Sequence, residues 1–171
     1  MFSFFSTLKA KRFLFAGLVL FLLAGFLGGC SSDVKDEENT KGLPNGLVGK
    51  WVDPTWGDFY EITRSGGTET LKYDSGYGSP SQGTIEFVSN FDANTGVIIV
   101  NYTTASDPGK PFGAVYYRNL TVSTVQMSDA YNGDYSSPNT ATREEAIAKF
   151  TRGKTGDFIA LWGGPYVKEA N

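Results

Sequence analysis

The chain has 171 residues, with 15 basic and 18 acidic side chains, a net charge of −3, one cysteine and no histidine. This length is typical of one domain with a core of its own. The missing histidines exclude Ser-His-Asp and Cys-His catalysis and imidazole-bound zinc. The acidic balance argues against nucleic acid as a partner, because such partners require a basic surface.

The first 29 residues have the layout of an export signal. Three basic residues between positions 9 and 12 precede an apolar run from Phe13 to Phe26, and Gly28 and Gly29 supply small residues before a cut. The run is shorter than the roughly 20 residues that a membrane-spanning helix needs. We therefore interpret residues 1–29 as a signal peptide, with an uncleaved membrane anchor as the alternative.

The stretch Leu27-Gly28-Gly29-Cys30 resembles the lipobox of bacterial lipoproteins. The resemblance implies cleavage before Cys30, acyl chains on that cysteine as the lipid attachment site, and the membrane as a partner. It places the protein in the bacterial cell envelope. Ser31 stands where an aspartate would signal retention in the inner membrane, so the outer membrane is favoured if the organism has one.

The processed chain would have 142 residues and, without three basic residues of the leader, 12 basic and 18 acidic side chains. Residues 30–46 are polar and rich in Ser, Asp, Glu, Asn and Gly, which is typical of a flexible tether. Residues 47–171 then form the folded domain. With Cys30 acylated, no disulfide remains to stabilise it.

From Leu47 onwards, short runs of alternating apolar residues separated by turns predict about eight strands. The strands are expected at residues 47–52, 58–63, 68–73, 84–88, 97–103, 112–118, 120–127 and 156–162. Thr142 and Glu145 form a capping-box pair for a short helix that ends at Gly153. The pattern predicts an all-β domain, either a closed antiparallel barrel or a sandwich.

The motif Gly49-Lys50-Trp51 on the first predicted strand is similar to the Gly-x-Trp signature of the lipocalins and their calycin relatives. The resemblance implies an eight-stranded antiparallel up-and-down barrel with Trp51 packed across its closed end. In that family a basic residue from near the last strand often covers the tryptophan, and Arg152 and Lys154 are candidates here. The helix expected before the last strand departs from the family, in which the helix follows the barrel.

Aromatic side chains fall on almost every predicted strand. Residues of one parity share the interior of a barrel, and a lumen lined by Tyr and Phe rings would suit a small hydrophobic or amphipathic ligand. The candidate ligand-binding residues are Tyr60, Tyr73, Phe87, Tyr102 and Tyr116. The alternative is a filled interior, because eight strands enclose a space that side chains can just fill.

Carboxylates are the remaining groups that could perform catalysis. Those in or near predicted strands are Asp53, Asp58, Glu61, Glu86, Asp129 and Asp134. Two of them could form a glycosidase-like pair, but solvated surface groups are the favoured interpretation, and Glu61 and Glu86 alternate with apolar neighbours that place them outside the barrel. Because no phosphate loop, nucleophile elbow or metal-loop motif is visible, we predict no enzyme activity, no cofactor and no metal.

Two functions remain open from the sequence. The first is a membrane-anchored lipoprotein whose lipocalin-like barrel binds a small hydrophobic or amphipathic ligand. The second is a filled barrel that acts through its outer surface as a structural or protein-interaction component of the cell envelope.

Overall fold

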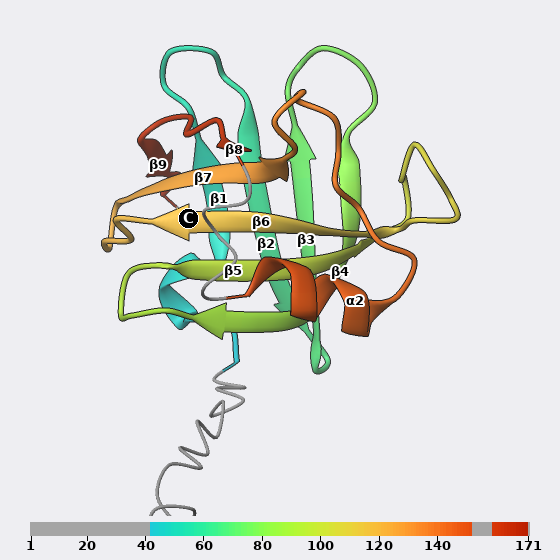
Figure 1. Ribbon diagram of the computed structural model, residues 1–171. Coiled ribbons are helices and arrows are strands. Elements are labelled where there is room, and N and C mark those ends of the chain that lie inside the picture. The colour runs from blue at the N-terminus through green and yellow to red at the C-terminus, as the bar shows by residue number, and fades with distance from the viewer. Residues whose placement is uncertain (1–41, 152–158, 171) are drawn as a thin grey trace, which may run out of the picture. The chain divides into compact units, whose positions relative to one another are not determined.

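The computed structural model describes residues 42–151 and 159–170 (Figure 1). The predicted signal peptide, the predicted lipid attachment site Cys30 and most of the predicted tether lie outside the described residues. So do Arg152 and Lys154, the candidate basic residues for covering Trp51.

The described chain contains nine strands, of which eight form a closed antiparallel barrel. Each strand from β1 to β7 pairs with the next, and β9 pairs with both β7 and β1 to close the circle. The strands are β1 (Gly49–Val52), β2 (Phe59–Ser65), β3 (Thr68–Asp74), β4 (Ser81–Asn90), β5 (Gly96–Tyr102), β6 (Phe112–Arg118), β7 (Thr124–Tyr131), β8 (Ile159–Ala160) and β9 (Tyr166–Lys168). The predicted all-β barrel with one short helix before the last strand is confirmed, and it is compatible with a lipocalin-like fold.

The β2–β3 hairpin illustrates how local sequence sets the register. The two strands pair from Phe59↔Asp74 to Ser65↔Thr68. Gly66 and Gly67 connect them with φ values of 57° and 82°. A two-residue turn with positive φ at both positions matches the twist of the strands, and glycine adopts it without steric cost.

The helix α2 (Arg143–Phe150) begins where the capping box predicts. The Thr142 hydroxyl accepts a hydrogen bond from the Glu145 backbone N–H at 3.2 Å. Ala146 and Phe150 on its inner face pack against Val97 and Ile99, which point outwards from β5. Figure 1 shows the helix lying across this side of the barrel. Strand β5 is therefore buried on both faces, which explains its continuous apolar sequence.

The interior of the barrel is filled with apolar side chains over much of its length. Six of the inward residues are almost fully buried: Trp51, Ile62, Leu71, Ile98, Val115 and Met127. The 3₁₀ turn η1 (Asn45–Leu47) precedes β1, and Leu43 and Leu47 join this core. The folded part thus includes residues that we predicted to belong to the tether, because these leucines cover one end of the barrel.

The predicted last strand at 156–162 is only partly correct. In the described part of this segment, β8 pairs with Ala130 and Tyr131 of β7. The strand that closes the barrel is β9, whose Val167 lies opposite both Val52 and Thr124. Strand β9 was not predicted, because three residues after Gly163-Gly164-Pro165 are too short to show a period-two pattern.

Candidate functional site

The two ends of the barrel differ in the length of their connections. In an up-and-down barrel, alternate connections meet at the same end. The connections 53–58, 75–80, 103–111 and 132–142 meet at the end that we call the loop end. The turn at Gly66-Gly67, residues 91–95, residues 119–123 and η1 meet at the other, which we call the closed end.

At the closed end, the Gly-x-Trp motif makes specific contacts. Trp51 Nε1 donates a hydrogen bond to the Leu47 carbonyl oxygen at 2.8 Å. Lys168 Nζ lies 5.0 Å from the Trp51 ring centroid, at a distance that favours a cation–π interaction. It also donates a hydrogen bond to the Gly46 carbonyl oxygen at 3.1 Å. Lys168 on β9 therefore stands where the resemblance implied a basic residue.

Gly49 is required at its position for two reasons. Its φ of 134° lies in a region that side-chain-bearing residues rarely adopt. A Cβ atom there would lie 2.7 Å from Cε of Lys168. The glycine thus makes room for the lysine that covers Trp51.

The structure divides the predicted ligand-binding residues into two groups. Tyr60, Tyr73 and Tyr102 belong to the interior of the barrel. Phe87 and Tyr116 instead pack outside the barrel wall, in the cluster beneath α2. Their predicted place in the lumen is therefore wrong.

A β-bulge explains the error at Phe87. Ile85 pairs with Val100 and Phe87 pairs with the next residue, Ile99, so that Glu86 is the extra residue in β4. The bulge reverses the alternation, and Val88 rather than Phe87 follows Ile85 into the interior.

The error at Tyr116 has a simpler cause. Tyr116 and Tyr117 are adjacent tyrosines, and alternation alone could not show which of them faces inwards. Tyr117 is the interior residue, whereas the Tyr116 hydroxyl donates to the Phe150 carbonyl oxygen of α2 at 3.2 Å.

Tyrosine rings and carboxylates gather inside the barrel towards the loop end. The Tyr60 ring lies 4.6 Å from the Tyr73 ring and 5.2 Å from the Tyr166 ring, edge-on to the latter. The hydroxyls of Tyr166 and Tyr73 donate to Asp58 Oδ2 at 2.8 and 3.3 Å. The Tyr102 hydroxyl donates to Asp129 Oδ1 at 3.3 Å.

The environment of Asp129 opposes its negative charge. Burial raises the pKa of Asp129 from 3.8 to about 6, and the hydrogen bond from Tyr102 offsets only part of this shift. The same burial, together with the nearby Asp129 carboxylate, raises the pKa of Tyr60 and Tyr102 above the usual value of 10. At neutral pH the tyrosines are neutral hydrogen-bond donors around a carboxylate.

Asp58 carries a buried oxygen atom without a hydrogen-bond partner. Its Oδ2 accepts the two phenol hydrogen bonds, but no donor in the described part of the chain reaches its Oδ1. Leaving a buried carboxylate oxygen unpaired costs about 1–3 kcal/mol or more. An unpaired buried carboxylate oxygen is unusual in a native protein.

A cavity of about 240 Å³ opens beside Asp129. Its lining is mostly polar and includes Ser81, Tyr102, Asp129, Tyr131, Ser137 and Asn139. The cavity exists because β6 and β7 separate towards this end. Their pairing ends at Val115↔Asp129, and Phe112 pairs with Thr140 instead.

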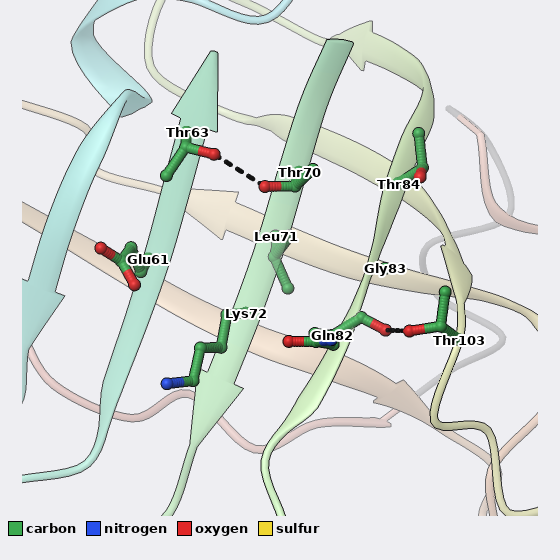
Figure 2. Close-up of a pocket in the computed structure, with 9 residues that line it drawn as sticks. All are labelled: Glu61, Thr63, Thr70, Leu71, Lys72, Gln82, Gly83, Thr84 and Thr103. Carbon is green, nitrogen blue, oxygen red and sulfur yellow. Dashed lines mark hydrogen bonds between the residues drawn. The ribbon is translucent and has the colours of Figure 1, made fainter. Parts of the chain in front are cut away.

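A second hollow, of about 320 Å³, lies on the outer face of β2, β3 and β4 (Figure 2). Figure 2 shows the hydroxyls of Thr63 and Thr70 bonded to each other, at 2.7 Å, on its floor. Glu61 and Lys72, which are register partners, border it. Its polar groups satisfy one another or face solvent, so it lacks the unpaired buried group seen at the loop end.

From the sequence, Asp58 and Asp129 were predicted only to be carboxylates in or near strands, and neither Tyr131 nor Tyr166 was predicted to belong to a site. A signal for Asp129 was present, because it continues the inward series of Val125 and Met127 on β7. Nothing comparable marked Asp58, whose role depends on Tyr166 from the far end of the chain.

Comparisons with family models, with curated proteins and with solved structures found no match for this chain. In the described residues, no helix has the length and apolar character needed to cross a membrane.

Proposed function

We propose that this protein is a lipid-anchored lipoprotein of the bacterial cell envelope whose lipocalin-like barrel binds a small amphipathic molecule at the loop end. The observation that carries the binding role is the cavity beside Asp129, whose lining combines the Tyr102 and Tyr131 rings with a buried carboxylate. Pockets that combine aromatic walls with a few convergent polar groups are typical ligand sites.

The dimensions of the site limit what enters it. The closed half of the interior is filled by side chains such as Trp51, Ile62 and Met127. A cavity of about 240 Å³ is smaller than the roughly 300 Å³ of a drug-sized pocket. It therefore fits the polar head or ring of a ligand rather than a whole lipid.

Exposed aromatic side chains surround the loop end and could contact the rest of the ligand. Trp56, Tyr77 and Tyr135 lie on three different loops there and are 76%, 85% and 62% exposed. A polar head in the cavity with an apolar part against these loops describes an amphipathic molecule.

The membrane anchor is tested separately from binding. Acyl chains contribute about 0.8 kcal/mol per buried methylene, and two or more chains hold a protein stably in the membrane. We expect Cys30→Ser to move the protein from the membrane pellet to the soluble fraction while its circular dichroism spectrum stays unchanged. A Cys30→Ser protein that remains in the pellet after a salt wash would contradict lipid anchoring.

The second candidate function, a barrel that acts through its outer surface, draws support from the hollow between β2, β3 and β4. Two matched variants separate the candidates. Ser137→Trp fills the cavity at the loop end, and Thr84→Trp fills the outer hollow. Ser137 is exposed, and Thr84 is half-buried on the outer face of β4, so each protein should fold.

The deciding measurement is native mass spectrometry of the full-length protein purified from its own host. We expect a reproducible bound small molecule that is lost in Ser137→Trp and retained in Thr84→Trp. A clean unliganded mass, repeated after lipid extracts are added back, would refute ligand binding and favour the outer surface.

A further inference from the structure

The carboxylates inside the barrel at the loop end have no basic partner among the described side chains. The ion pairs of the described chain join Lys50 to Glu169, Arg64 to Glu69, Lys72 to Asp74 and Arg143 to Glu144. Asp58 and Asp129 take part in none of them, and their described hydrogen-bond donors are neutral tyrosine hydroxyls. A buried carboxylate without a cation leaves a strong negative potential in its cavity.

Tyrosine rings surround this negative region. Tyr60 and Tyr73 are close enough to Asp129 to feel its charge, and Tyr131, which lines the cavity, does as well. The faces of aromatic rings carry negative partial charge and attract cations. Carboxylates and ring faces therefore both favour a positively charged ligand.

We propose that the head group held in this cavity is a protonated organic amine, bound by the Asp129 carboxylate and the rings of Tyr102 and Tyr131. This inference rests on the proposed ligand-binding function and adds the chemical class of the ligand. An ammonium group has three donors, and the Asp129 carboxylate, whose described side-chain donor is the Tyr102 hydroxyl, offers it an acceptor.

A metal ion fits the same residues less well. In the described part of the chain, no three carboxylate, cysteine or histidine side chains come together in a way that could hold one. Calcium takes six to eight oxygen ligands, typically including several carboxylates. An amine needs only one or two carboxylates and gains from the tyrosine rings that a metal would not use.

The experiment compares three probes that share one ring and differ in charge. Benzylammonium, benzyl alcohol and benzoate are titrated into the full-length protein by isothermal titration calorimetry at pH 7.5. We expect benzylammonium to bind at least ten-fold more tightly than benzyl alcohol and benzoate to show no binding. Equal affinities for benzylammonium and benzyl alcohol would overturn the amine inference but leave a ligand-binding barrel.

Two variants locate the effect. Asp129→Asn should weaken benzylammonium at least ten-fold and leave benzyl alcohol within two-fold. Glu61→Gln removes the same charge from the outer face of β2 and should change neither affinity. Equal weakening by both variants would show that the net charge of the protein, rather than Asp129 itself, determines the affinity. That result would overturn the assigned site. If none of the three probes binds the unaltered protein, the amine inference is overturned, and the native mass spectrum of the protein from its own host decides ligand binding at the loop end.

Discussion

The closed end and the loop end of this barrel use the same inward-facing positions for different purposes. At the closed end, Trp51 is fully buried, its N–H is hydrogen-bonded to Leu47, and Lys168 covers its ring. At the loop end, Asp129 is charged at the expense of stability and Asp58 keeps an unpaired oxygen. The comparison indicates that one end of the barrel stabilises the fold, whereas the other keeps buried polar groups that cost stability. In the proposed function, the second is the end that binds the ligand.

The largest effect is expected at the closed end. Trp51→Ala removes a large buried ring and should lower the free energy of unfolding by about 3–5 kcal/mol. Urea denaturation followed by circular dichroism measures it. Trp56→Ala at the loop end is the control and should change little, because Trp56 is exposed. An unchanged denaturation midpoint for Trp51→Ala would show that the closed end does not stabilise the fold through Trp51.

The next effect tests the glycine of the same motif. Gly49→Ala forces a side chain into a φ of 134° and towards Lys168, which should cost about 1–3 kcal/mol. Gly46→Ala is the control, since its Cβ would make only an ordinary contact with Leu120 at 3.6 Å. If both variants have the same stability in thermal unfolding, Gly49 has no special role.

At the loop end, by contrast, a substitution should raise the free energy of unfolding. The pKa of Asp129 is raised to about 6 in the folded state from 3.8, so the folded protein binds more protons than the unfolded chain between about pH 4 and 6. Stability linked to this group is therefore greatest below pH 4 and falls as pH rises to 6. Asp129→Asn should remove that loss and stabilise the protein by up to about 3 kcal/mol at pH 7.5.

Denaturation at several pH values measures the effect of Asp129→Asn. The stability difference from the unaltered protein should grow between pH 4 and 6 and then stay constant. The groups that face Asp129 in the described chain are Tyr60, Tyr73, Tyr102 and Tyr131, none of which titrates in this range. A variant that is less stable at every pH would show that Asp129 serves the fold.

The smallest effect concerns the hydrogen bonds to Asp58. Tyr166→Phe removes the shorter of its two phenol donors and should cost about 0.5–1.5 kcal/mol. Tyr116→Phe, outside the barrel, removes a hydroxyl bonded to a backbone carbonyl and serves as a matched comparison. A gain in stability for Tyr166→Phe would show that the Asp58 cluster is not an organised network.

Sequence patterns predicted the parts of the molecule that local rules control. Alternation located strands such as β2 and β3, and the Thr142–Glu145 pair located the start of α2. The short run at Tyr166–Lys168 has no local signal, because only its two long-range partners make it a strand. The closing strand was therefore missed.

The candidate site was predicted in part for the same reason. Tyr60, Tyr73 and Tyr102 follow simple alternation and were placed in the interior, where they lie. Phe87 was misplaced because one extra residue, Glu86, forms a β-bulge that reverses the alternation. No local pattern in the sequence marks this bulge. The bond from Tyr166 to Asp58 joins residues 108 positions apart, which no local pattern can show.

The position of the closing strand also determines when the barrel can form. Trp51 and Lys168 are register partners but are 117 positions apart in the chain. Contacts of such high sequence separation form late and slow the folding reaction, because a long loop must close first. The chain would therefore expose the edges of β1 and β7 until its last strand arrives, and open edges invite pairing with other chains. The C-terminal strand is therefore the part of the chain that protects both edges from such pairing.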